Sequence, residues 1–242
     1  MDNETEKKRA GRILTFSYVL CFVIVLAGVN RLWKTVPLKQ PVWDILRLCD
    51  VNVMFIFAPL SLLMVWLIFR EYKGDSFTGG TLLFLAGVYL GGAGFGMHEP
   101  ANIAVSVYSK ALPGAVKASL FFFDDKLGHW IFFASFSAIT IAVIWAENRN
   151  PLNNALKFKY LLSFLVMGLI CAAVIYFNMV REKTTLDIAV LIFIAFLSIF
   201  IQFIYGRRIA ALPLTLAVYT AYLLGSAATL LHWALWFIGV SL

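Results

Sequence analysis

Residues 188–205 read IAVLIFIAFLSIFIQFIY, a run of 18 residues without a charged side chain. A helix needs about 20 mainly apolar residues to cross the hydrocarbon core of a bilayer, with a range of roughly 17 to 25. Lipid solvates such a surface on every side of the helix, whereas water does not. We therefore predict that this stretch is a transmembrane helix.

Six further apolar runs of similar character lie elsewhere in the chain, at residues 13–29, 51–69, 81–97, 120–146, 160–177 and 212–240. Hydrophobic residues make up 62% of the sequence and charged residues 14%, which is more apolar surface than one soluble core can bury. Short hydrophilic loops join the runs, so consecutive helices should be antiparallel neighbours. We expect an all-α polytopic membrane bundle of seven transmembrane helices that forms one domain over residues 1–242.

The charges of the loops predict the orientation. With the N-terminus inside, the inner loops hold 11 Lys and Arg residues and the outer loops hold 9, and cytoplasmic loops carry the excess of these residues. We expect the N-terminus inside and the C-terminus outside, in the plasma membrane of a prokaryote or in an endomembrane. In the connection after the first helix, residues 42–48 are expected to lie flat as an interfacial helix.

The formal net charge of +7 does not indicate a nucleic-acid partner. The basic residues sit in short clusters between apolar runs and form no stripe interleaved with aromatic residues, so we interpret them as membrane anchors. The expected partners are the lipid bilayer and a lipidic small molecule, with association into homo- or hetero-oligomers left open. Cys21, Cys49 and Cys171 are far apart in the sequence and form neither a disulfide framework nor a CxxC motif.

The three histidines, His98, His129 and His232, are the most informative residues, because each lies within or at the edge of a predicted membrane segment. Ionisable groups at membrane depth are costly and usually functional. Counting about 1.5 Å per residue from the inner helix ends puts all three roughly 25 to 30 Å from the inner face. We expect them to meet near the outer hydrocarbon boundary.

Carboxylates cluster at the same expected level. Glu99 follows His98 directly, and Asp124 and Asp125 precede His129 by about one turn. The spacing of Asp125 and His129 is i, i+4, which puts both on one face of an ordinary α-helix. Asp50 and Asn52, at the outer end of the second helix, are also expected to reach this layer.

Three imidazoles with a carboxylate suit a divalent transition metal, with zinc favoured over iron or copper. The predicted metal ligands are His98, His129, His232 and Asp125. Asp125 is alternatively the catalytic base that activates water, a role for which Glu99 and Asp124 compete. Such a site predicts a metal-dependent membrane enzyme, most simply one that hydrolyses a lipid amide or ester at the outer boundary.

The third predicted helix is rich in glycine, with Gly92 and Gly96 forming a small-xxx-small pair. Small residues at this spacing let two membrane helices approach closely. We interpret the glycines as a packing face.

Seven helices with three histidines and an acid near one membrane face resemble the superfamily of alkaline ceramidases and adiponectin receptors, which are zinc-dependent lipid amidases. In that family an early helix carries Ser-x3-His, an Asp follows, and the last helix carries His-x3-His. Here Gly94 stands four residues before His98, and Ala228 and Trp236 stand four residues on either side of His232. The resemblance implies zinc-dependent hydrolysis of a lipid amide.

Three other interpretations stay open. The Asp125-x3-His129 pair is similar to the copper-ligand pair in the C subunit of membrane methane and ammonia monooxygenases, with Ala142 where a later histidine is found there, and this implies an iron or copper oxidase subunit. Two of the histidines could instead ligate haem. The acids and histidines would also suit proton or cation transport, and a non-catalytic membrane subunit needs no chemistry at all.

Overall fold

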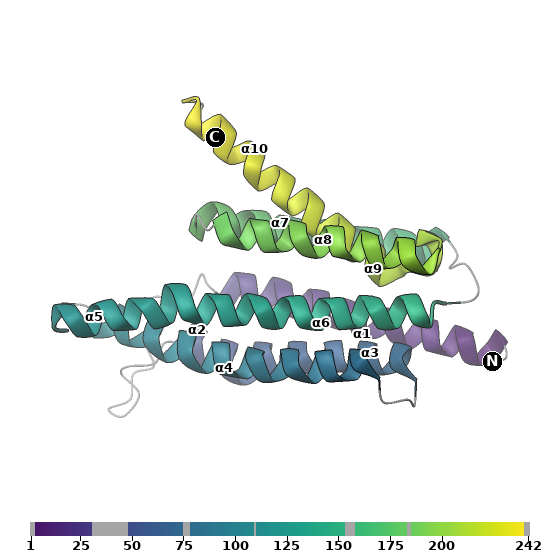
Figure 1. The fold of residues 1–242 in the computed structure, drawn as a ribbon, viewed down its shortest axis with the longest axis horizontal. Coiled ribbons are helices and arrows are strands. Elements are labelled where there is room, and N and C mark those ends of the chain that lie inside the picture. Colours follow the sequence, from purple (N-terminus) through teal and green to yellow (C-terminus); the bar gives the residue numbers. More distant parts are fainter. Residues whose placement is uncertain are drawn as a thin grey trace.

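The structure is a computed structural model that describes residues 3–30, 48–74, 78–108, 110–152, 158–182 and 185–239. Within these ranges the chain forms helices and short turns, with no strand. The helices run roughly along one long axis, and the chain starts and finishes at opposite ends of it (Figure 1). This arrangement is the one that an odd number of membrane crossings produces.

The first half of the chain contributes three long helical segments. They are α1 (Asn3–Asn30), then α2 (Leu48–Asn52), η2 (Val53–Phe57) and α3 (Ala58–Lys73) in one continuous helix, and then α4 (Gly79–Tyr108). The η2 segment is a single stretch of π-helix inside an otherwise α-helical span.

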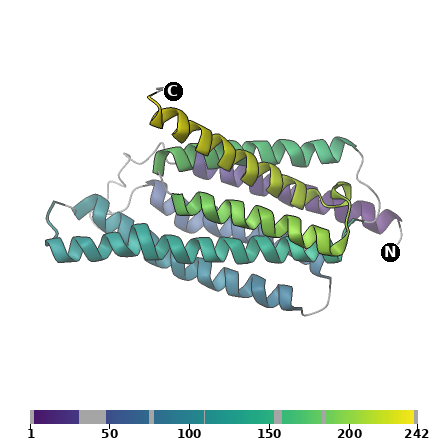
Figure 2. The same cartoon turned by 45° about the horizontal axis from the view of Figure 1, so that its top comes forward.

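The second half contributes four. The first is one continuous helix made of α5 (Gly114–Phe121), η3 (Phe122–Gly128) and α6 (His129–Arg149). The second and third are α7 (Phe158–Glu182) and α8 (Thr185–Tyr205). The fourth follows the short 3₁₀ helix η4 (Ile209–Ala211) and is the continuous helix made of α9 (Pro213–Tyr219), η5 (Thr220–Leu224) and α10 (Gly225–Phe237). Both η3 and η5 are π-helical. In the views of Figures 1 and 2, α10 diverges from α8 as it approaches the C-terminus.

Seven helices are long and apolar enough to span a membrane, so the predicted number is confirmed for the described part of the chain. Most of the helices extend further than the apolar runs, whereas the last one, predicted over 212–240, is described as helix from Pro213 to Phe237. α1 begins at Asn3, ten residues before the predicted start, and α4 continues through Pro100 to Tyr108. Proline is tolerated inside membrane helices because neighbouring groups satisfy the freed backbone carbonyl. The expected interfacial helix at 42–48 falls outside the described residues except for Leu48, which begins α2.

One face of α8 shows how the bundle meets lipid. Phe193, Phe196, Phe200 and Phe203 follow one another at helical spacing, and between 57% and 81% of each side chain is exposed. A soluble protein does not display such a row of aromatic side chains to water. The chain is therefore an integral, multi-pass membrane protein, and this face of α8 lies against acyl chains.

The glycines of α4 pack this helix against α6, but not through the predicted pair. A Cβ on Gly87 would lie 2.7 Å from the side chain of Ile139, and a Cβ on Gly91 would lie 2.7 Å from Oγ of Ser135. The Ser135 hydroxyl donates a 2.7 Å hydrogen bond to the carbonyl oxygen of Gly87. Gly92 and Gly96 have no neighbouring atom within 4 Å of where a Cβ would stand. The close approach predicted from the glycine content is real, and it uses a different face of the helix.

Two cysteines that are distant in the sequence meet in the core. The thiols of Cys21 on α1 and Cys171 on α7 lie close to each other, and both side chains pack in the cluster that includes Ile13, Phe69 and Phe84. Phe69 and Phe84 stack with ring centroids 4.6 Å apart. This cluster holds α1, α3, α4 and α7 together.

Candidate functional site

His98 and Asp124 form the centre of the candidate site, near the end of the bundle opposite the α3–α4 turn. Nδ1 of His98 lies 2.7 Å from Oδ1 of Asp124 and 3.2 Å from the backbone oxygen of the same residue, to which it can donate a hydrogen bond. Asp124 is only 7% exposed, and among the described atoms its Oδ1 has no partner aligned as a hydrogen bond. The site thus contains a buried carboxylate paired with an imidazole.

His129 lies beside His98. The two imidazole rings are 5.0 Å apart between centroids and meet edge to face at 68°. His98 comes from α4, and His129 is the first residue of α6, directly after η3. The structure therefore brings together two of the three predicted histidines and one of the predicted acids.

Two glycines make this approach sterically feasible. A Cβ on Gly128 would lie 2.6 Å from the carbonyl oxygen of Phe123 and 3.1 Å from Cβ of His98. On α4, one turn before His98, a Cβ on Gly94 would lie 2.9 Å from the backbone nitrogen of Phe132. Any larger residue at either position would push α4 away from the η3–α6 helix and separate the two histidines.

The acid that contacts His98 lies in the π-helical turn η3. In such a turn the backbone hydrogen bonds join residues i and i+5, so side chains are rotated relative to an ordinary α-helix. The i, i+4 spacing put Asp125 on the helix face of His129, and the acid that the structure shows in contact with His98 is Asp124. The backbone of Asp125 belongs to η3, and its side chain lies outside the described residues. Single π-turns inside α-helices are frequent at functional sites.

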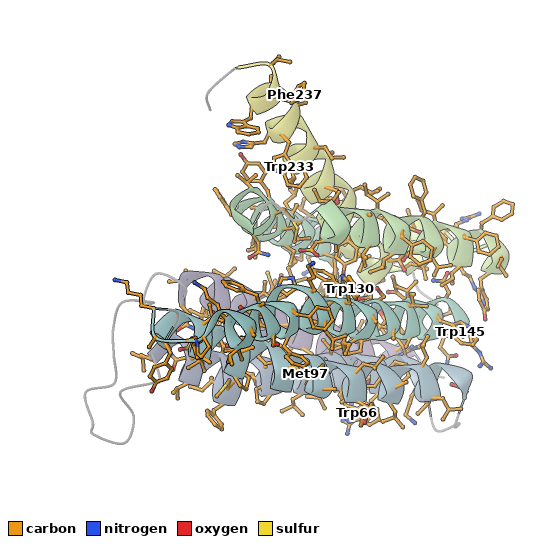
Figure 3. The ribbon with its side chains drawn as sticks, turned by 60° about the vertical axis from the view of Figure 1, so that its left-hand side comes forward. Trp66, Met97, Trp130, Trp145, Trp233 and Phe237 are labelled. Carbon is orange, nitrogen blue, oxygen red and sulfur yellow. The ribbon has the colours of Figure 1, made fainter. Side chains whose placement is uncertain are left out.

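His232 occupies a different environment. Its Nδ1 lies 3.1 Å from the hydroxyl of Tyr176 on α7, and the two rings are 5.8 Å apart between centroids. The next residue, Trp233, is seen on α10 well away from Met97 and Trp130, the neighbours of the other two histidines (Figure 3). Over the residues whose side chains the structure describes, no group of three or more His, Cys, Asp or Glu has the arrangement of a metal site. The three-histidine metal site remains a prediction.

The other predicted polar residues of this layer are buried. Glu99 is 8% exposed on α4, and Asp50 is 4% exposed on α2. Asn52 donates a 2.9 Å hydrogen bond to the side-chain oxygen of Asn30, which in turn donates to the carbonyl oxygen of Cys49 at 2.7 Å. These amides join α1 to α2 at the same end of the bundle.

A second polar cluster, at the opposite end, was not predicted. The fully buried carboxylate of Glu147 accepts hydrogen bonds from the backbone N–H groups of Leu214 and Thr215 at 2.9 and 2.8 Å. It also accepts from the Thr215 hydroxyl at 2.6 Å and from the Tyr72 hydroxyl at 3.1 Å. Glu147 thus caps the first turn of α9 from the last turn of α6. In the sequence, the only sign of this cap is that Glu147 directly follows an apolar run, and an acid at the start of a loop has the same pattern.

Arginines extend this cluster toward α1. Arg9 donates to the backbone oxygens of Glu71 and Asn150 at 2.9 and 2.7 Å, and its guanidinium lies over the ring of Tyr72. Arg12 makes a two-pronged contact with the Glu71 carboxylate, with both N–O distances 2.8 Å. The cluster fastens α1 to α3 and to the end of α6.

No family model, curated protein or solved structure matches the chain.

Proposed function

We propose that the chain is a metal-dependent membrane enzyme whose site is built around His98, His129 and Asp124, and that it hydrolyses an amide or ester bond of a lipid. The observation that carries the proposal is the pairing of two imidazoles with a buried carboxylate across the α4–η3 contact. Ionisable side chains at this depth in a membrane bundle are costly unless they bind something or one another.

The types of donor suit a borderline divalent metal, although the described side chains do not group three ligands around one point. Because Nδ1 of His98 is directed to Asp124, Nε2 is the nitrogen available to a metal, with the carboxylate fixing the ring in the way that supports metal-ligating histidines elsewhere. His129 would supply a second nitrogen, and Asp125, whose side chain lies outside the described residues, is the predicted source of a ligating oxygen. Two imidazoles and carboxylate oxygens favour zinc or iron over a monovalent copper ion, which prefers sulfur.

The chain's own residues would prepare the site for reaction. Asp124 holds the tautomer of His98 in which Nδ1 carries the proton, and Glu99 and Asp125 are the other acids that could accept a proton from water. A bound zinc ion would supply the Lewis acidity that polarises a carbonyl group. Exposed aromatic residues next to the histidines, such as Phe122, Phe123 and Trp130, lie where the acyl chain of a lipid substrate would enter from the bilayer.

Elemental mass spectrometry tests the metal. Protein purified in detergent without added metal is expected to contain zinc, or another transition metal, at close to one ion per chain. His98→Ala and His129→Ala should each lose it, while Lys126→Ala, an exposed neighbour in the same π-turn, should keep it. His232→Ala decides whether the third histidine belongs to the site. Well-folded protein that binds no zinc, iron or copper even after incubation with them would contradict the proposal.

Release of fatty acid tests the reaction. Metal-loaded protein in vesicles should cleave a fluorescent ceramide or a fluorescent ester lipid, and His129→Ala should reduce the rate at least about a hundredfold, the size expected for loss of metal or acid-base chemistry. A metal-loaded protein that cleaves neither lipid would support the metal site and remove the hydrolase assignment.

A further inference from the structure

A small cleft opens at the end of the bundle opposite the histidines. It has a volume of about 140 Å³ and is lined by Lys73, Thr78, Gly80, Trp145, Arg149 and Asn150, among others. A water molecule in the liquid takes about 30 Å³, so the space suits a group of several heavy atoms. The residues come from three places, namely the end of α3, the start of α4 and the end of α6.

The charge of the cleft is positive. Lys73 and Arg149 are its charged side chains, and neither forms an ion pair with any residue that the structure describes. Two nearby acids do not neutralise them, because Glu71 is engaged by Arg12 and Glu147 is fully buried under Thr215. The cleft therefore presents two cations with the hydroxyl of Thr78 and the second N–H of the Asn150 amide, whose first N–H is donated to the carbonyl oxygen of Tyr72 at 3.0 Å.

The depth of the cleft in the membrane points to a lipid. It lies where three of the spans end, which is the level of the polar headgroups. Trp145, in its wall, donates a 2.8 Å hydrogen bond from its indole to the hydroxyl of Tyr205. Tryptophan and tyrosine with their polar atoms paired at a helix end are typical of the membrane interface.

We propose that this cleft binds the phosphate of an anionic phospholipid headgroup, with Lys73 and Arg149 as the charged ligands. Thr78 and Asn150 donate hydrogen bonds to the phosphate oxygens, and the acyl chains run down the surface of the bundle. The start of α4 beside the cleft adds the partial positive charge of a helix N-terminus. The proposal is independent of the proposed metal site, which lies at the other end of the bundle.

Native mass spectrometry of the full-length protein tests it. The wild-type protein, offered equal amounts of phosphatidylglycerol and phosphatidylcholine in detergent, is expected to retain one phosphatidylglycerol. The double variant Lys73→Gln/Arg149→Gln should bind it about tenfold or more weakly, as loss of two interfacial cations implies. The matched control Arg70→Gln/Arg208→Gln removes two exposed cations outside the cleft and should retain the lipid.

Three results would overturn the proposal. One is a wild-type protein with no preference for the anionic lipid, a measurement that needs no variant to fold. Another is an equal loss of lipid in the control, which would assign binding to general surface charge. The third is displacement of the lipid by millimolar inorganic phosphate, which would assign the cleft to a free anion. The single variants Lys73→Gln and Arg149→Gln replace the double variant if it is not monodisperse.

Discussion

The carboxylate of Glu147, in the last turn of α6, accepts a 2.8 Å hydrogen bond from the backbone nitrogen of Thr215 and a 2.6 Å bond from its hydroxyl. Thr215 lies in the first turn of α9, where the N–H groups have no partner within their own helix. A buried acid from one transmembrane helix therefore caps the start of another. Both residues are 0% exposed, so water cannot replace the contact.

Replacing Glu147 by alanine should destabilise the fold strongly. The change leaves two backbone N–H groups and the hydroxyls of Thr215 and Tyr72 buried without this acceptor, each at a cost of about 1–3 kcal/mol, so we expect a loss of roughly 4 kcal/mol or more. Glu147→Gln keeps one acceptor oxygen and should lose less. Unfolding in detergent followed by circular dichroism measures the order, with the exposed Glu4→Ala as control. Equal stability of Glu147→Ala and wild type would show that the cap contributes nothing.

The two arginines of α1 should differ in their contribution. Arg9 is 8% exposed and bonds two partly buried backbone oxygens, so Arg9→Ala removes a buried side chain and both of its hydrogen bonds and should cost about 1–3 kcal/mol. Half of the Arg12 side chain is exposed at 51%, and its pair with Glu71 should contribute only about 0.2–1 kcal/mol. We test this ranking by measuring the free energy of unfolding of Arg9→Ala, Arg12→Ala and Glu71→Ala. The Arg12–Glu71 double variant then gives the coupling energy of the pair. An Arg12 effect larger than that of Arg9 would contradict the ranking.

Hydropathy was sufficient to predict the number of spans, and it was insufficient to predict their ends. The first ten residues of α1 include charged side chains such as Arg9, which continue the helix because they bond other helices instead of water. The same reason explains why α6 continues past its apolar run to include Glu147. It was expected in the loop after residue 146, but α6 runs to Arg149 and buries it. In a single sequence, an acid in a loop cannot be distinguished from a buried acid that caps a helix. The distinction needs the position of its partner on α9, Thr215.

Counting residues along the helices predicted the neighbours of His98 in part. It indicated that His98 and His129 share one depth, and their rings do meet. Depth says nothing about the direction in which a side chain points around the helix axis, and His232 instead contacts Tyr176 on α7. Nor does a pattern based on 3.6 residues per turn foresee the π-turn η3, which contains the Asp124 that contacts His98.

The contact between Cys21 and Cys171 predicts a specific cross-link. Oxidation with the membrane-permeable reagent diamide should join them, with the two thiols giving two electrons and two protons to the reagent. Digestion and mass spectrometry should then find the α1 and α7 peptides linked, with a mass about 2 Da below their sum. Cys49, which donates to Asp50, should remain a free thiol.

Variants make the cross-linking result decisive. Cys49→Ala should still form the link, whereas Cys21→Ser and Cys171→Ser should each abolish it. A link between Cys49 and either partner, at protein concentrations that exclude contacts between molecules, would mean that α1 and α7 do not pack as the structure has them.

The glycines of the α4 contact offer the sharpest test of the candidate site, because some of them are packed and others are open on the same helix. Gly94→Ala and Gly128→Ala place a Cβ against backbone atoms at 2.9 and 2.6 Å, and such overpacking costs about 1–3 kcal/mol. Gly92→Ala and Gly96→Ala meet nothing within 4 Å and should stabilise the helix by about 0.5–1 kcal/mol. Because Gly128 lies against His98, Gly128→Ala should also weaken metal binding. The weakening should persist at a temperature at which the variant is fully folded, so that its lower stability alone does not explain it. If all four variants had the same stability, the approach of α4 to η3 and α6 would not depend on these glycines, and the site drawn around His98 and His129 would lose its structural basis.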